Sequence, residues 1–324
     1  MGLQNQRRTA DPQIVNDLYL KTARLLTQVA PFVFADETFA LKGGTAINLF
    51  VRDMPRLSVD LDLVLPDHTL SRDAALRKIK DSLGKAADAL KAKGFRTHLS
   101  GVPAADETKL FVKRDDAEVK VEVNYVMRGT VKPVSVMGLA PRAQEVLQAE
   151  LDIPVVSLDD VYGGKLVAAM DRQHPRDLFD VMQLLENEGI TSGIRRAFVV
   201  YLASHKRPIH EVLFPRLRDV STEFQANFQG MTTEPVELDA LLAARDQMIA
   251  TLHKELDAEE RAFLVTLANA APEWHRMGIA HLGAMPAIQW KLQNLAKLKE
   301  LNPAKFEEQS RELAEKISGL GEAR

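Results

Sequence analysis

The 324-residue sequence contains no cysteine. This absence excludes disulfide bonds, thiolate zinc sites, iron–sulfur clusters and a thiol nucleophile, and it fits a reducing compartment. The eight histidines show no ligand spacing such as H-x-x-x-H, so we expect no zinc site. No stretch approaches the roughly 18 uninterrupted apolar residues of a membrane span, and no apolar run follows the arginines near the start. We therefore expect a cytoplasmic protein that does not bind a membrane.

An excess of one sign of charge is missing too. Lysine and arginine number 42 against 45 aspartates and glutamates, which gives a net charge of −3. This balance excludes a chain that is polycationic throughout, so any binding site for RNA must be local. Hydrophobic residues at 46% and charged residues at 27% are ordinary values for a globular protein.

Strand and helix patterns alternate in the first half of the chain. Residues 57–65 alternate in polarity with a period of two, and residues 108–114 and 118–127 indicate two further strands. Residues 76–90 keep the spacing of a helix that ends at Gly94. This mixture predicts an α/β (α+β) fold in which helices flank a sheet.

From Ser157 to the end the patterns are only helical. They cover residues 158–170, 176–188, 236–255, 258–270, 286–298 and 303–318. The change near residue 155 predicts an α/β domain over residues 1–155 and an all-helical domain over residues 156–324.

The helical half also holds aromatic and basic residues of two possible uses. The aromatic residues, which lie among many leucines and alanines and are expected in the core, are Trp274, Trp290, Phe224 and Phe228. The basic residues, which fit either a groove for an RNA backbone or solvated helix faces, are Arg195, Arg196, Lys206, Arg207, Lys291, Lys297 and Lys299.

The strand at residues 57–65 carries two carboxylates on its polar face. Asp60 and Asp62 are two residues apart, so both point to the side opposite the leucines. Such a pair favours a hard divalent cation, Mg²⁺ or Mn²⁺, which completes its coordination with water and phosphate oxygens. Glu122 adds a third carboxylate if its strand pairs beside this one. The alternative is a solvated strand face, which an isolated D-x-D often is.

A glycine turn precedes these aspartates. Gly43 and Gly44 allow backbone N–H groups to face a phosphate, while Lys42 adds a positive charge and Thr45 a hydroxyl. The turn opens a helix, and Asp60 follows fifteen residues after Thr45. The pattern is neither a Walker A loop nor a dinucleotide fingerprint. We expect a phosphate site and a metal site to converge here.

Two residues at the start of the same strand can serve this site. Ser58 shares the face of Asp60 and Asp62, so it can contact a phosphate or a metal-bound water. Arg56 can contact a phosphate. Either residue can instead be an ordinary residue at the entry of a strand.

A second cluster of charged residues follows the domain boundary. Lys165 and Arg172 are seven residues apart and fall on one helical face, from which both can reach a triphosphate. Arg176 and Asp180, four residues apart on the next helix, fit either an ion pair or a substrate contact. Asp177 lies in the first turn of that helix, where the helix dipole favours an acid.

Together these segments resemble the AbiEii/AbiGii-like (MenT-like) nucleotidyltransferase toxins. L-K-G-G-T followed by R-L-S-V-D-L-D-L is similar to the superfamily signature of a glycine turn, a helix and a strand bearing D-x-D. The segment from Lys165 to Asp180 is similar to the K-L-x-A-x-x-x-R and R-D-x-x-D motifs of the toxins. The resemblance covers about residues 38–188, including V-K-V-E-V-N at 119–124, and P-A-I-Q-W-K-L-Q-N-L at 286–295 looks similar as well.

The resemblance implies a fold and an activity. It implies the mixed sheet of the nucleotidyltransferase superfamily, completed at the active site by the first helices of the helical domain, about residues 157–188. It implies transfer of a nucleotide from an NTP, with Mg²⁺ or Mn²⁺, to an RNA acceptor, the 3′ end of tRNA in characterised relatives, which blocks translation. Such proteins are toxins of toxin–antitoxin and abortive phage-infection systems. The expected partner is a separately encoded antitoxin, often winged-helix and AbiEi-like, which need not bind the toxin.

The family's motifs also imply residue roles. The catalytic residues are Asp60, Asp62, Glu122, Lys165 and Asp177, of which Asp60, Asp62 and Glu122 are the metal ligands. The residues that bind the nucleotide and its phosphates are Lys42, Gly43, Gly44, Thr45, Arg56, Ser58, Lys165, Arg172 and Arg176.

Two other functions fit the same residues. One is a nucleotidyltransferase that modifies a protein or a small molecule instead of RNA. The other is a non-catalytic module that binds a nucleotide or a partner, although such a scaffold has no need for two clustered carboxylates. The sequence does not say which NTP is used.

Overall fold

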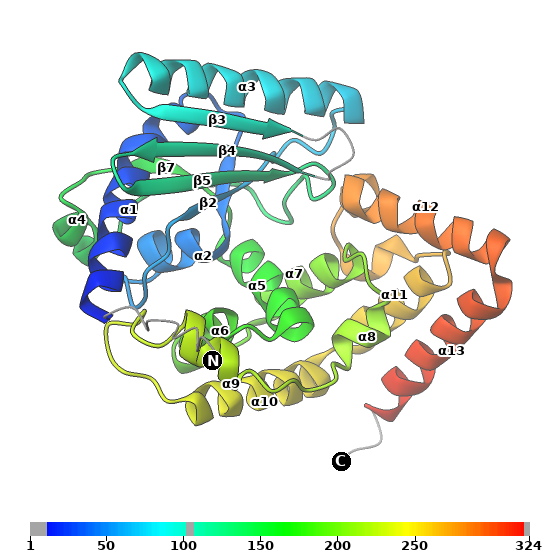
Figure 1. Ribbon diagram of the computed structural model, residues 1–324. Helices are drawn as coiled ribbons and strands as arrows, with labels where there is room; N and C mark the ends of the chain where they lie inside the picture. The colour runs from blue at the N-terminus through cyan, green and yellow to red at the C-terminus, as the bar shows by residue number, and fades with distance from the viewer. Residues whose placement is uncertain (1–11, 102–106, 321–324) are drawn as a thin grey trace, which may run out of the picture.

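The computed structural model describes residues 12–101 and 107–320 (Figure 1). Its sheet is mixed, has seven strands and follows the order β3-β4-β5-β2-β1-β7-β6. The strands are β1 (Ala40–Lys42), β2 (Asp60–Val64), β3 (Arg96–Gly101), β4 (Glu107–Arg114), β5 (Ala117–Asn124), β6 (Ser135–Gly138) and β7 (Asp152–Val155). β2 pairs in parallel with β5 and antiparallel with β1, so the sheet is mixed at its centre.

The helices of the first half pack around this sheet. They are α1 (Pro12–Val33), α2 (Gly43–Ala46), which continues as a π-helical turn over Ile47–Val51, α3 (Arg72–Ala92) and α4 (Pro141–Leu147). α1 packs against β5 and β2, and α3 packs against β3 and β4. The alternating valines of β5, Val119, Val121 and Val123, are fully buried on that side of the sheet.

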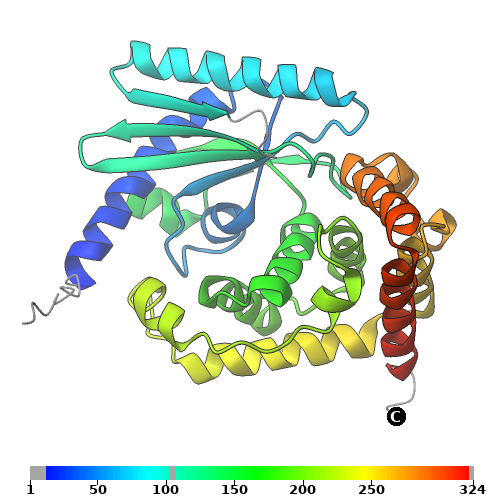
Figure 2. The same cartoon turned by 45° about the vertical axis from the view of Figure 1, so that its right-hand side comes forward.

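Helices make up the rest of the described chain. They are α5 (Leu158–Arg172), α6 (Pro175–Glu186), α7 (Ser192–Ala203), α8 (Ile209–Leu213), α9 (Ser221–Asn227), α10 (Leu238–Glu255), α11 (Ala258–Ala268), α12 (Pro286–Leu301) and α13 (Pro303–Gly319), with 3₁₀ turns at Trp274–Met277 and Leu282–Ala284. Figure 2 shows this helical region below the sheet. The predicted fold class, a mixed sheet flanked by helices and then a largely helical region, is therefore confirmed. The domain boundary near residue 155 stays a prediction.

Two predicted elements differ at their ends. The strand expected over residues 57–65 begins at Asp60, because Leu57 donates its N–H to the carbonyl of Met231 rather than to a strand. The strand expected over residues 118–127 ends at Asn124, whose side-chain oxygen accepts the N–H groups of Val126 and Met127 at 2.8 Å each. Such an Asx turn closes the chain on itself and stops the ladder.

The helical region also corrects two expectations about its side chains. Trp290, which we expected in the core, is 49% exposed on α12. Lys291, one of the cations considered for a groove, is instead buried and donates to the carbonyls of His205 and Arg207. Burial lowers the pKa of Lys291 to about 8.

None of the helices in the described ranges combines the length and the apolar character that a membrane span requires.

The contact between α5 and α7 depends on the absence of one side chain. A Cβ at Gly163 would lie 2.7 Å from the Cβ of Ala197 and 2.8 Å from the backbone N of Phe198. Distances this short leave no room for a methyl group, so the two helices approach each other at a glycine.

This contact yields a test with two neighbouring glycines. We expect Gly163→Ala to destabilise the fold by about 1–3 kcal/mol through overpacking. The matched variant Gly164→Ala should stabilise it by up to about 1 kcal/mol, because its nearest neighbour, Tyr201, is 3.9 Å away and alanine favours the helix. Urea unfolding measures both. A stabilising change in both variants would show that the packing at α7 is looser than described.

Candidate active site

The two aspartates of β2 lie on one face of the sheet. Leu61 and Leu63, which alternate with them, have no exposed surface, whereas Asp60 and Asp62 are partly exposed on the opposite face. Glu122 is the register partner of Asp62 on β5, so the third carboxylate lies on the neighbouring strand. Register partners in a sheet point to the same side, so all three carboxylates face the same way.

Glu122 is held by lysines in this arrangement. Its Oε2 lies 2.8 Å from Nζ of Lys120, and its Oε1 lies 3.9 Å from Nζ of Lys109. Lys120 Nζ also lies 3.9 Å from Oδ2 of Asp60. Within the described ranges no group of three or more Asp, Glu or His side chains converges as a ligand set.

The pair Asp60 and Asp62 nevertheless has the chemistry of a metal site. Burial raises the pKa of Asp60; the positive charge of Lys120 opposes this and the negative charge of Asp62 adds to it. Two close carboxylates repel each other when both are ionised, so a cation between them is favoured. Two carboxylates, with water and phosphate oxygens, satisfy the usual coordination of Mg²⁺ or Mn²⁺. The residues present therefore fit one such ion.

The glycine turn lies directly against these carboxylates. Lys42, the last residue of β1, is the register partner of Asp62, and α2 begins at the next residue. Gly43 has a φ of +75°, and a Cβ there would lie only 2.4 Å from Oδ2 of Asp62. Glycine is required both by this backbone conformation and by this contact. The helix therefore starts at the glycines themselves, not after them as a separate turn would.

Hydrogen bonds fix the same turn to β2. Thr45, which is almost fully buried, donates its hydroxyl to the carbonyl of Asp60 at 2.5 Å and lies 3.0 Å from the hydroxyl of Ser58. A Cβ at Gly44 would lie 2.9 Å from the guanidinium of Arg56 and 3.0 Å from Ser58 Oγ. The turn, Ser58 and the aspartates thus form one closely packed corner.

A buried ion-pair network lies behind this corner. Asp180 on α6 has no exposed surface and accepts two hydrogen bonds from Arg56, at 2.7 and 2.6 Å. Lys165 on α5 donates to Asp180 at 2.9 Å and to Asp177 at 2.8 Å. Arg172, whose side chain is 62% exposed, donates to the other side of Asp177. The network joins residues from before β2 to both helices.

The charges of this network determine how its acids titrate. Burial on its own would raise the pKa of Asp177, but the cations of Lys165 and Arg172 outweigh it and hold this pKa well below its usual range. The pKa of Asp180 is also lowered, because Arg56 and Lys165 overcome its burial. Both acids are therefore ionised at neutral pH.

Arg176 is placed differently from the other cations. Its spacing to Asp180 suits an ion pair, yet Asp180 is bound by Arg56 and Lys165, and Arg176 forms no ion pair with any described residue. Its positive charge opposes the rise in the pKa of Asp60 that burial causes. Arg176 is thus a half-buried cation next to the aspartates of β2.

One member of the site was missed by the sequence interpretation. Asn48 is fully buried, and its amide donates to the carbonyl of Gly44 at 2.9 Å and to Asp180 at 3.1 Å. It therefore connects the glycine turn to the ion-pair network. The available signal was a single amide inside the apolar run A-I-N-L-F.

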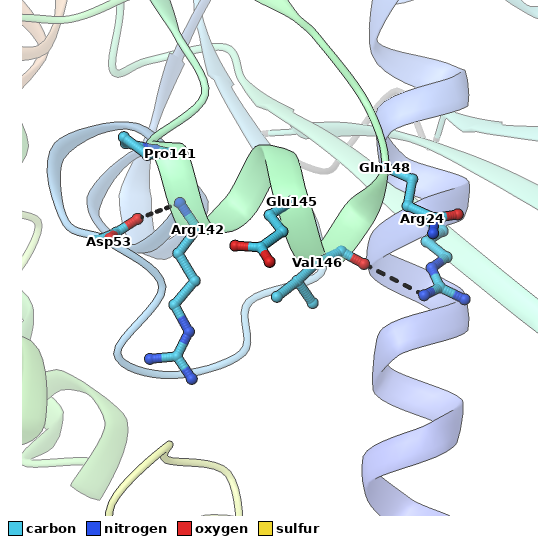
Figure 3. Close-up of a pocket in the computed structure, with 7 residues that line it drawn as sticks. All are labelled: Arg24, Asp53, Pro141, Arg142, Glu145, Val146 and Gln148. Atoms are coloured by element: carbon cyan, nitrogen blue, oxygen red, sulfur yellow. Dashed lines mark hydrogen bonds between the residues drawn. The ribbon is translucent and has the colours of Figure 1, made fainter.

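A separate hollow on the surface does not involve these residues (Figure 3). It lies between α1, α4 and the loop before β2, and is lined by Arg24, Asp53, Pro141, Arg142, Glu145, Val146 and Gln148. Acids and bases alternate around it, and its open, mixed lining gives no preference for one ligand class.

The network yields a stability test. Asp180→Asn removes the charge that faces both Arg56 and Lys165, so we expect a loss of about 3–5 kcal/mol, because an uncompensated buried charge remains. Glu315→Gln breaks the exposed pair with Arg311 and should cost less than about 0.5 kcal/mol. Urea unfolding compares the two. Equal, small losses would show that the buried pairs do not hold α6 in place.

Comparisons with known proteins identify the family of the chain. A family model described as nucleotidyl transferase AbiEii toxin, type IV TA system, matches residues 24–294. The chain is similar in structure to MenT4, a nucleotidyltransferase toxin from Mycobacterium tuberculosis H37Rv, with a TM-score of 0.59 and 19% identity over 86% of this chain and 99% of that chain. A search of curated proteins finds no match. Because the family match spans most of its length, the chain belongs to the AbiEii family of nucleotidyltransferase toxins of type IV toxin–antitoxin systems.

Proposed function

We propose that the protein transfers a nucleoside monophosphate from an NTP to the 3′ end of an RNA and releases pyrophosphate. The acceptor that we propose is tRNA. The observation that carries this proposal is the contact between the glycine turn and Asp62, because it unites a phosphate-binding backbone with a metal-binding carboxylate. The activity would stop translation, and the expected partner is an antitoxin of the AbiEi type.

In this proposal the carboxylates hold the metal. Asp60 and Asp62 bind Mg²⁺ or Mn²⁺. Glu122 is the third acidic residue of the site, and its ion pair with Lys120 keeps that lysine beside Asp60. The ion, when bound, supplies positive charge to the triphosphate and to the departing pyrophosphate.

The other side chains fall into two groups. The first group binds phosphates and consists of Lys42, the N–H groups of Gly43 to Thr45, Ser58, Arg172 and Arg176. Arg172 and Arg176 can reach a phosphate because both are at least partly exposed. Arg56 and Lys165 are buried against acids, so they position the turn and α6 around the phosphates instead of reaching out to them.

Asp177 belongs with the second group. A carboxylate whose pKa is held low is a weak proton acceptor, so Asp177 is a poor general base. Its role is to orient Lys165 and Arg172, and the proton of the attacking hydroxyl passes to another carboxylate of the site or to water.

The direct test follows the label from the NTP. Purified protein is incubated with Mg²⁺, total tRNA and each α-³²P-labelled NTP in turn, and the products are separated on a denaturing gel. We expect label on tRNA, and a loss of at least about a hundredfold in Asp60→Asn and in Asp62→Asn. Asp246→Asn, an exposed carboxylate on α10, is the matched control and should keep full activity.

The outcomes separate the candidate functions. Undiminished label in both variants would contradict the metal site. Label on protein in a lysate, with none on RNA, would replace the RNA acceptor by a protein one. Absence of any transfer, with unchanged toxicity of the Asp62→Asn protein in cells, would favour the non-catalytic module.

A second test addresses the glycine turn. Gly43→Ala places a methyl group against Asp62 and keeps a positive φ, so we expect at least a hundredfold loss of transfer. Gly189→Ala has the same kind of strain, with a φ of +69°, but open space around it. Gly189→Ala should lose about 1 kcal/mol of stability and Gly43→Ala at least as much, whereas only Gly43→Ala should lose activity. Equal activity losses would attribute the effect to general destabilisation.

A further inference from the structure

The face of the sheet that carries the aspartates continues across three more strands. α1 and α3 cover the opposite face, and Figure 1 shows α3 running along β3. On the aspartate face, the side chains of β3, β4 and β5 are exposed or partly exposed. They are Arg96, His98, Ser100, Glu107, Lys109, Phe111, Lys113, Glu118, Lys120, Glu122 and Asn124.

Strand register aligns four of these positions in one row. Asp60 on β2 is opposite Lys120 on β5, Lys120 is opposite Phe111 on β4, and Phe111 is opposite His98 on β3. Adjacent strands are about 4.8 Å apart, so Phe111 and His98 lie about 10 and 14 Å from Asp60 along the sheet. The row leads straight from the proposed metal site to the edge of the sheet.

The far end of the row is an aromatic pair with no role in the core. The rings of Phe111 and His98 are stacked, with centroids 6.3 Å apart and an angle of 26° between their planes. His98 is exposed, and Phe111 is only partly buried and lies outside the hydrophobic core. Exposed aromatic rings on a sheet are the surface on which single-stranded nucleic acids stack their bases.

A hollow and a free cation accompany these rings. The hollow has a volume of about 260 Å³ and is lined by Arg96, Thr97, His98, Phe111, Lys113 and Glu118. Lys113 is paired with Glu118 at 2.8 Å, whereas Arg96 forms no ion pair within the described residues and donates only to the carbonyl of Asp115. An aromatic ring beside a guanidinium suits a base and its phosphate.

The geometry of the reaction favours the acceptor over the NTP as the occupant. The glycine turn, which binds the phosphates in the proposed function, follows β1, on the side of β2 away from β5. In-line displacement places the attacking hydroxyl on the side of the α-phosphate opposite the leaving pyrophosphate. The acceptor therefore approaches over β5, β4 and β3, which is where the row lies.

We propose that this row binds the acceptor RNA, with a base near its 3′ end stacked on Phe111 and His98 and a backbone phosphate at Arg96. The 3′ hydroxyl then reaches Asp60 and Asp62 past Lys120. This inference rests on the proposed function and deepens it by naming the surface that receives the acceptor.

Direct binding tests the surface without catalysis. Fluorescence anisotropy follows a labelled single-stranded RNA of about ten nucleotides in the absence of NTP. We expect Phe111→Leu to raise the Kd about tenfold and Phe111→Tyr to keep the Kd of the unaltered protein, because only an aromatic ring stacks. Arg96→Ala should weaken binding and reduce the slope of log Kd against log salt by about one.

Trp290 provides the matched control, since it is an exposed aromatic residue on α12. Trp290→Leu should leave the Kd unchanged. If Trp290→Leu weakens binding and Phe111→Leu does not, RNA binds the helical region and the proposal is wrong. Circular dichroism confirms that each variant is folded.

Transfer kinetics separate the acceptor from the NTP. Phe111→Leu should raise the KM for tRNA about tenfold and leave the KM for the NTP and kcat at saturating tRNA unchanged. A rise in the KM for the NTP alone would place the base of the NTP in the hollow and overturn the assignment. If the unaltered protein labels no RNA, the proposed function fails, whereas a normal tRNA KM in Phe111→Leu contradicts only this inference.

Discussion

The buried contact of Asp180 with Arg56 and Lys165 holds the site together. Arg56 precedes β2 by a few residues, whereas Lys165 and Asp180 belong to α5 and α6, more than a hundred residues later. A charged group without exposed surface is tolerated only with close partners, so these three side chains fix one another's positions. The corner of glycine turn and aspartates is shaped by residues from both halves of the chain.

Local patterns in the sequence predicted the parts of this site but not their long-range partners. The alternation around Asp60 and the motif helices at 158–170 and 176–188 lie within a few residues of β2, α5 and α6. Arg176 was an obvious helical neighbour of Asp180, yet Arg56, distant in sequence, offers a two-point contact to the same carboxylate. Spacing along one helix cannot reveal a competitor that folding brings from another segment.

β3 escaped prediction because it depends on its neighbour. β3 has the sequence R-T-H-L-S-G, with little apolar alternation, and becomes a strand because it pairs with β4 along its whole length. Aromatic residues show the same dependence. Trp290 lies near leucines and alanines in the sequence but is exposed, and Phe111 lies between the buried Leu110 and Val112 of β4 but faces away from the core. Which side of an element is covered is decided by tertiary packing.

The closeness of Gly43 to Asp62 also bears on how such a gene would mutate. No amino acid has a smaller side chain than alanine except glycine itself, so position 43 offers no graded series of weaker variants. Every substitution that a single base change can produce there inserts at least a methyl group against the carboxylate. A single base change at this codon therefore never yields an intermediate variant, because each resulting side chain must displace Asp62 or the start of α2.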